Sequence, residues 1–258
     1  MKILFIGDTV ARAGREFVRD HLGALKAEYQ VDFTVLNCEN AAAGFGVTPK
    51  IADEMLTWGI DVLTSGNHVW DKREILGYLD TQERILRPAN YPPGNPGHGT
   101  VVLETRTGER VAIVNVQGRT FMPAIDDPFR SVDAELGALS ADIRVIVVDF
   151  HAEATAEKVA MGWYLDGRAS AVLGTHTHIP TADERILPQG LAYQTDVGMT
   201  GPFDSVIGMT KESVMDRFHK QIPVRFKVAS KDVELNAAVI DVDPETGKAR
   251  SIERVHRQ

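Results

Sequence analysis

Carboxylate, amide and imidazole side chains follow five separate apolar runs of this 258-residue sequence. The runs and the side chains after them are Ile3–Ile6 with Asp8, Phe33–Leu36 with Glu39 and Asn40, Ile60–Leu63 with Asn67 and His68, Arg144–Phe150 with His151, and Ala169–Leu173 with His176 and His178. Each run is typical of a short buried strand. Ligands of open α/β sheets bind at the carboxyl ends of the strands, so we expect these side chains to meet there.

The side chains at these strand ends are suited to divalent metal ions. Oxygen and imidazole ligands without a thiolate favour manganese, iron or zinc over copper(I) or a structural zinc site. Cys38 lies within the second cluster, but a lone cysteine among such ligands is more typical of a small packed residue. The ligands are too many for one ion and suffice for two. Two such ions, roughly 3.5–4 Å apart and bridged by a carboxylate, can clamp a phosphoryl group.

Each cluster taken singly also has a structural explanation. Asp8 could cap a helix, Asn67 could belong to a turn, and a lone His68 or His151 could be a hydrogen-bonded structural residue. The pair in His176-Thr177-His178 is a stronger signal, because residues i and i+2 of an extended segment point to the same side. The occurrence of all five clusters at five strand ends favours a functional site.

Elements that would position these residues alternate along the first seventy positions. Short apolar runs at Lys2–Ile6, Phe33–Leu36 and Ile60–Leu63 predict strands, and helical spacing predicts helices over Ala13–Tyr29 and Thr48–Leu56. This alternation indicates a parallel sheet with crossover helices.

The rest of the chain predicts a second sheet. The expected elements are a hairpin of Val101–Glu104 and Arg110–Val116, a central strand at Arg144–Phe150, a helix at Ala154–Trp163, a strand at Ala169–Leu173, a turn at Pro188–Gly190 before Leu191–Gln194, and late strands at Val224–Val228 and Val233–Ile240. We therefore expect a single α/β domain over residues 1–258, a sandwich of two mixed β-sheets flanked by α-helices.

Composition restricts the setting and the partners. Lys and Arg number 28 against 36 Asp and Glu, a net charge of −8, which argues against a broad nucleic-acid surface. One cysteine permits no intramolecular disulfide, the apolar run at the N-terminus is too short for a signal peptide, and no segment is long enough for a membrane span. We expect a cytoplasmic protein with a small-molecule ligand, and a homo-oligomer on general grounds. Two bound divalent ions would leave the site at about +2 beside two carboxylates, which attracts a phosphate.

The chain resembles a known superfamily in the order of its motifs. Gly7-Asp8, Gly66-Asn67-His68, His151 and Gly174-Thr175-His176-Thr177-His178 are similar to the ordered blocks of the calcineurin-like metallophosphoesterases. The segments Asn37–Ala42, Gly66–Asp71 and Thr195–Pro202 resemble the YmdB-like branch, and together these blocks cover nearly the whole chain. Two departures from the wider superfamily, Val10 in place of a histidine and Glu39 in place of an aspartate, are shared by that branch.

The resemblance implies a metallophosphoesterase-like fold and a role for each site residue. Asp8, Glu39, Asn40 and His178 would hold one metal ion, and Glu39, Asn67, His151 and His176 the other, with Glu39 as the bridge. His68 would be the general acid for the leaving alkoxide, a role that suits histidine because its side chain titrates near neutral pH. The nucleophile would be a metal-bridging hydroxide. Iron or manganese is expected first, as two divalent or mixed-valence ions, and zinc also fits.

Phosphodiester hydrolysis of 2′,3′-cyclic and 3′,5′-cyclic nucleoside monophosphates is the activity that the resemblance implies. Two alternatives stay open: a phosphomonoesterase or phosphoprotein phosphatase on the same site, and a regulatory protein that binds metal or nucleotide with incidental hydrolysis. Candidate substrate-binding residues are Phe45, His98, Thr200 and Phe203, for which loop packing is the simpler explanation. The glycine-containing segment Thr195–Gly201 could also place backbone N–H groups near a phosphate.

Overall fold

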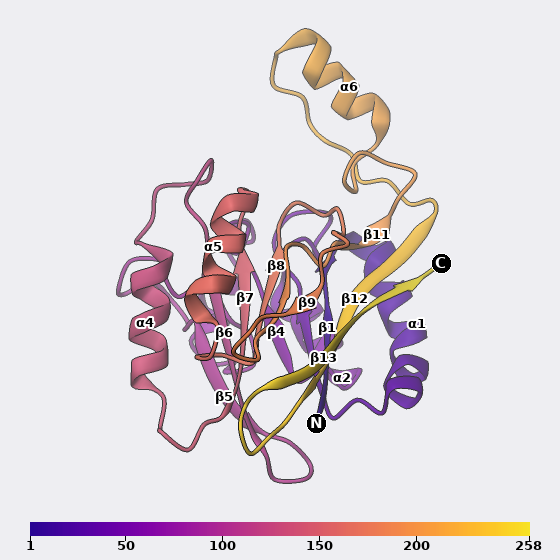
Figure 1. Ribbon diagram of the computed structural model, residues 1–258. Helices are drawn as coiled ribbons and strands as arrows, with labels where there is room; N and C mark the ends of the chain where they lie inside the picture. Colours follow the sequence, from indigo (N-terminus) through magenta and orange to yellow (C-terminus); the bar gives the residue numbers. More distant parts are fainter.

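The computed structural model describes all residues, 1–258, and contains two β-sheets packed face to face between layers of helices (Figure 1). The first sheet has the order β2-β11-β12-β1-β3-β4, with β13 paired to β12. Its strands are β1 (Lys2–Ile6), β2 (Asp8–Thr9), β3 (Phe33–Asn37), β4 (Val62–Thr64), β11 (Met199–Pro202), β12 (Val233–Val242) and β13 (Ala249–Arg257). The strands β1, β3 and β4 are parallel, whereas β12 is antiparallel to β1.

The second sheet has the order β5-β6-β7-β8-β10-β9. Its strands are β5 (Thr100–Glu104), β6 (Arg110–Gln117), β7 (Val145–His151), β8 (Ala171–Thr175), β9 (Arg185–Ile186) and β10 (Ala192–Gln194). The central strands β6, β7, β8 and β10 are parallel, and antiparallel β5 and β9 form the edges. The predicted hairpin and the interior position of the most apolar run are thus both confirmed.

Apolar side chains from both sheets form the central core. Phe5 and Val35 of the first sheet belong to the same buried cluster as Ile113, Val147 and Leu173 of the second. The opposite faces of these strands are covered by helices, so the strands are buried on both sides and their sequences are almost continuously apolar.

The chain forms six helices. They are α1 (Ala11–Tyr29), α2 (Pro49–Thr57), α3 (Ile75–Leu79), α4 (Pro128–Ala138), α5 (Thr155–Leu165) and α6 (Lys211–Lys220). Helices α1 and α2 contact the first sheet, and α4 and α5 the second. Helix α2 begins where expected, because the Thr48 hydroxyl accepts a hydrogen bond from the Ile51 backbone N–H and Pro49 stands at the first turn. The predicted fold class, α/β with two mixed sheets flanked by helices, is confirmed.

One predicted strand is wrong. Residues 222–226 make no hydrogen bond through their backbone, and only Val228 forms an isolated bridge, with Met209. The alternation of apolar and charged residues is present, but pairing is limited to its end, where the Thr210 N–H donates to Lys227 O at 2.7 Å and the Ala229 N–H donates to Gly208 O at 2.9 Å. This segment and α6 project from the body of the molecule (Figure 1). The sequence analysis also missed α3, α4, α6, β2, β11 and β13. None of the helices has the length and apolarity needed to cross a bilayer.

Candidate metal centre

The predicted site residues meet at the carboxyl ends of five strands, three from the first sheet and two from the second. They follow β1, β3, β4, β7 and β8, which end next to one another where the two sheets meet. The parallel directions of these strands are the reason why residues distant in sequence converge at one point.

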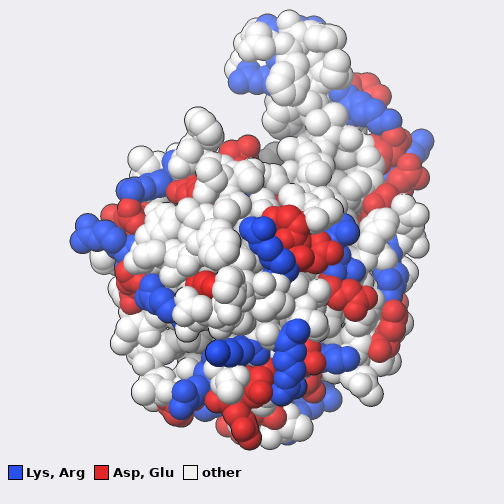
Figure 2. Space-filling view, in the orientation of Figure 1, with Lys and Arg blue, Asp and Glu red and all other residues white.

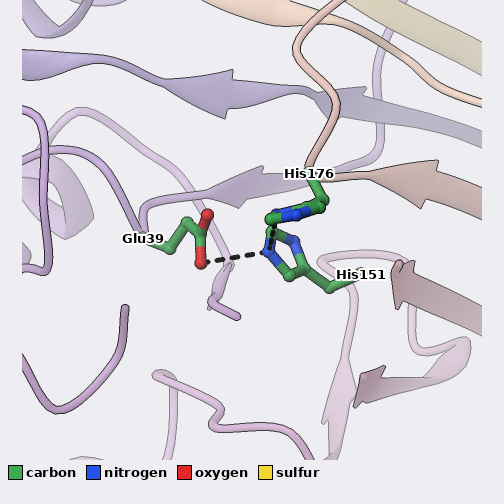
Figure 3. A group of neighbouring side chains, drawn as sticks. All are labelled: Glu39, His151 and His176. Atoms are coloured by element: carbon green, nitrogen blue, oxygen red, sulfur yellow. Dashed lines mark hydrogen bonds and ion pairs between the residues drawn. The ribbon is translucent and has the colours of Figure 1, made fainter. Parts of the chain in front are cut away.

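One group of ligand atoms surrounds the ring of His151. Its Nε2 lies 3.1 Å from Glu39 Oε2, 3.1 Å from Asn67 Oδ1 and 3.1 Å from His176 Nδ1. Figure 3 shows Glu39, His151 and His176 pointing toward one another from three different segments. One N–H can serve only one of these acceptors well, whereas a cation at their centre could bind all of them.

A second group of ligand atoms shares Glu39 with the first. Carboxylate oxygens of Asp8 and Glu39 and a ring nitrogen of His178 lie within 4.8 Å of one another. Asn40 Oδ1 is 3.2 Å from His178 Nε2. Asp8 Oδ1 is buried and has no hydrogen-bond partner, which is costly for a carboxylate unless a cation lies beside it. The donor atoms and this orphaned oxygen fit divalent metal ions, and Glu39 belongs to both groups.

The charges of these side chains are strongly coupled. Burial raises the pKa of Asp8 well above its usual range. Burial would also raise the pKa of Glu39, but the charge and hydrogen bond of His151, together with the charges of His68 and His176, lower that pKa to about 2. Burial would lower the pKa of His151, but the Glu39 carboxylate raises it to about 9. Burial and the charge of His151 together lower the pKa of His176 to about 3. These mutual shifts are typical of a functional site.

Glycine is required at the start of the Gly66-Asn67-His68 segment. A Cβ atom on Gly66 would lie 2.2 Å from His151 Cδ2 and 2.3 Å from Glu39 Oε2. Any other residue would therefore push apart the two ligands that this segment approaches.

His68 stands beside the ligands without joining either group. Its ring Nδ1 lies 2.9 Å from Asp71 Oδ2, and its backbone N–H donates to Glu39 Oε2 at 3.3 Å. The ring of Phe45 meets it edge-on at a centroid distance of 4.9 Å. The side chain is 29% exposed, and its Nε2 has no partner in the protein. Asp71 thus orients a ring whose second nitrogen is free to face a ligand.

Sequence reasoning missed the residues that orient His151. Thr175 Oγ1 lies 2.8 Å from His151 Nδ1 and donates to Asp149 Oδ1 at 2.7 Å. Asn37 Nδ2 donates to Asp149 Oδ2 at 3.0 Å. Asp149 is fully buried, and burial raises its pKa. This chain of contacts orients the ring so that Nε2 faces the ligand group. The available signal was a charged residue inside an otherwise apolar strand.

A buried ion pair supports the loop that carries the other two histidines. His176 and His178 have positive φ angles of 96° and 68°, which are unfavourable for residues with a Cβ. Thr177 between them donates to Asp196 Oδ2 through its hydroxyl at 2.7 Å and its backbone N–H at 3.2 Å. The same oxygen lies 2.5 Å from Lys158 Nζ, and neither charged side chain is exposed by more than 1%. Asp196 thereby holds the strained loop in place.

The glycine-containing segment Thr195–Gly201, which follows β10, supports the histidine-bearing loop. Its backbone N–H groups bond within the protein and are not directed at a phosphate site. The backbone N–H of Val197 donates to Gly174 O, that of Gly198 to Asp196 Oδ1, and that of Met199 to His178 O. These donors are already satisfied within the protein.

The candidate substrate-binding residues are dispersed. Phe45 is the one that lies beside His68. The ring of His98 instead contacts Glu83 O at 3.0 Å. The Thr200 side chain is buried and bonds to the backbone of Asn236, and Phe203 packs on the small cluster of Val10, Ala11 and Met199. Contact with the substrate stays a prediction for Phe45, and the structure does not bring His98, Thr200 or Phe203 to the ligand groups.

Comparison with known proteins agrees with this geometry. The family model described as YmdB-like protein matches residues 4–255. This chain belongs to the YmdB-like family. A relative from Bacillus subtilis, 50% identical over 99% of this chain and 96% of its own length, is named 2′,3′-cyclic-nucleotide 2′-phosphodiesterase. The predicted resemblance is therefore confirmed.

Two solved structures share the whole fold of this family member. A protein from Thermus thermophilus superposes with a TM-score of 0.93 at 43% identity, covering 100% of this chain and 99% of the other. A protein from Mycoplasma pneumoniae, described as a novel phosphatase, superposes with a TM-score of 0.93 at 34% identity, covering 100% and 93%.

Proposed function

We propose that this chain hydrolyses 2′,3′-cyclic nucleoside monophosphates, and 3′,5′-cyclic ones as a further substrate class, with two metal ions as cofactors. The observation that carries the proposal is the position of Glu39, which belongs to both ligand groups and also accepts the backbone N–H of His68. A general acid next to a bridged two-metal centre is the minimal arrangement for cleaving a cyclic phosphodiester.

The enzyme class expected from the sequence, a phosphoric diester hydrolase, is confirmed by the half-identical relative that carries such a name. The metal identity and the number of ions belong to the proposal. The donor atoms are oxygen and imidazole nitrogen throughout, which suits iron or manganese and also zinc. We further propose a small-molecule substrate, a cytoplasmic location and a homo-oligomeric state.

The residues would share the work as follows. Asp8, Asn40 and His178 would hold one ion, Asn67, His151 and His176 would hold the other, and Glu39 would contribute to both. When bound, the ions stabilise negative charge on the phosphoryl oxygens and lower the pKa of a coordinated water. His68 donates a proton from Nε2 to the ribose oxygen that leaves, while Asp71 holds the opposite nitrogen of the ring. Phe45 limits the space beside that ring.

The decisive experiment compares rates and metal content in one preparation. The substrates are 2′,3′-cyclic AMP, 3′,5′-cyclic AMP, bis-p-nitrophenyl phosphate and p-nitrophenyl phosphate. We expect Glu39→Gln to lose both metal and turnover, and His68→Ala to lose turnover by about 100-fold or more with its metal retained. His256→Ala, in which an exposed histidine far along the chain is removed, is the matched control and should behave as the wild type.

Two results would contradict the proposal. Turnover of the monoester in preference to every diester would favour the phosphatase alternative. The Mycoplasma pneumoniae protein of similar fold is described as a phosphatase. Two equivalents of metal without turnover of any substrate would favour a binding protein.

A further inference from the structure

A projecting arm stands apart from the two-sheet body. The arm, defined as residues 203–231, leaves the body after β11, includes α6 and returns to β12 (Figure 1). Figure 2 shows the arm clear of the body, with Lys and Arg side chains and uncharged surface over its outer part. Within α6 only Ser213 and Val214 are buried. Most of the helix surface therefore has no partner in this chain.

The exposed surface of α6 includes an apolar face. Met215 and Phe218 have the helical spacing i, i+3 and lie on one side of α6, and Ile222 follows the helix after the left-handed cap residue Gln221. Their side chains are 47%, 65% and 53% exposed. Apolar anchors at this spacing are the pattern by which a helix docks into a partner.

The segment after α6 has backbone N–H and C=O groups without hydrogen-bond partners. Residues 222–226 make no backbone hydrogen bond, although the apolar residues Val224 and Phe226 alternate with Arg225 as in a strand. The strand predicted here from sequence is therefore missing a neighbour to pair with. A segment with a strand-like pattern and unpaired backbone groups is a typical site for pairing with another chain.

Charge indicates which surface would cover the arm. The arm contains six Lys and Arg against three Asp and Glu, a net charge of +3. The whole chain carries −8, so the remaining residues carry −11. Arg217, Arg225, Lys227 and Lys231 form no ion pair within the chain, whereas Lys211 and Lys220 pair with Asp204 and Asp216. An arm against another arm would bring like charges together, but an arm against the body of a second copy joins opposite charges.

We propose that the arm docks on the acidic body of a second copy of this chain, so that two copies exchange arms in a symmetric homodimer. The apolar face of α6 would be buried in this contact, and the free backbone of residues 222–226 would find hydrogen-bond partners there. Two-fold symmetry makes the exchange reciprocal and closes the assembly. The proposal does not depend on the proposed activity.

The test measures the mass of the protein in solution by sedimentation over a wide dilution series. We expect the wild type to have twice the mass of the chain, and added salt to weaken the dimer because unlike charges meet in it. The double variant Met215→Glu with Phe218→Glu should raise the dimer dissociation constant by about 100-fold or more, as expected for the loss of buried anchors. The control Arg217→Gln with Lys220→Gln changes the net charge by the same amount and leaves the apolar face intact. It should have the smaller effect, and circular dichroism should show equal helix content in both variants.

Cross-linking then distinguishes the two ways in which arms could meet. Mixed preparations of isotopically light and heavy chains, treated with an amine-reactive cross-linker, should join arm lysines of one copy to body lysines of the other. A monomeric wild type at every concentration, a dimer that the double Glu variant leaves unchanged, or cross-links between arms alone would overturn the proposal. Binding of a monomeric wild type to anionic lipid vesicles would also overturn it and assign the arm to a membrane surface.

Discussion

Replacing Lys158 with methionine is a test of how the histidine-bearing loop is held. Lys158 Nζ lies 2.5 Å from Asp196 Oδ2, and both side chains are almost completely buried. The carboxylate also accepts two hydrogen bonds from Thr177, between the candidate ligands His176 and His178. Methionine keeps much of the length and apolar volume of lysine and removes the charge. The variant therefore leaves a buried carboxylate without its cation.

The expected loss of stability follows from the burial of the pair. Removal of one partner of a buried ion pair costs roughly 3–5 kcal/mol. Asp196 would keep the hydrogen bonds from Thr177 and from the Gly198 backbone N–H, so we expect the lower end, about 3 kcal/mol. For a chain of this size each kcal/mol lowers the melting temperature by about 2–4 °C, which gives a decrease of about 6–12 °C. Lys158→Met with Asp196→Asn should recover part of the loss, because no buried charge then lacks a partner.

Metal affinity is the measurement that separates positioning from stability alone. Thermal unfolding and metal titration would be carried out on wild type, Lys158→Met, the double variant and Lys220→Met, an exposed lysine that serves as control. If Asp196 holds the loop, Lys158→Met should bind metal at least about tenfold more weakly at temperatures where it is fully folded, as other supporting residues of metal sites do. Wild-type stability together with wild-type metal affinity would refute the reasoning.

Three further predictions concern the same site. Asp71→Asn should lower kcat by about tenfold to 100-fold and alter its pH profile, with unchanged metal content, because the ring of His68 loses its carboxylate partner; an unchanged profile would argue against that role. Thr175→Val should weaken metal binding by about 10–100-fold in a titration, since His151 loses the hydrogen bond that orients it, and wild-type affinity would show that the contact is dispensable. Removal of metal by a chelator should lower the melting temperature. The loss of stability is about 2.7 kcal/mol for each site when the free metal concentration before chelation is about 100 times the dissociation constant. An equal melting temperature with and without the chelator would contradict a structural contribution of the ions.

Most of the candidate ligands could be predicted because their signal is local. Each one directly follows a short apolar run, and parallel strands bring such positions together whatever the loop lengths are. The supporting residues had no such signal. Asp149 lies inside a run that is apolar elsewhere, and Lys158 lies on a helix, where a lysine is ordinarily exposed. Their roles depend on which residues face them across the fold.

In the segment from α6 to β12, a clear sequence pattern predicted a strand that the structure does not contain. The alternation in Val224–Val228 is a genuine strand pattern, yet strand formation needs a neighbour along its length, and only the end of this segment, at Lys227 and Val228, meets residues 208–210. Phe45 and His98 show the same limit for the substrate site, because both lie in glycine-containing loops and only one of them meets His68.

The sequence by itself determined the strands that carry the candidate ligands, the two-sheet architecture and the ligand types, since apolar periodicity and the residues at strand ends are properties of neighbouring positions. Only the tertiary structure decided that Asp149 and Asp196 orient the histidines and that the arm stands uncovered. These features arise from distances of a few ångströms between residues on different strands, loops and helices, or from the absence of such contacts. Packing sets those distances, and no local pattern encodes them.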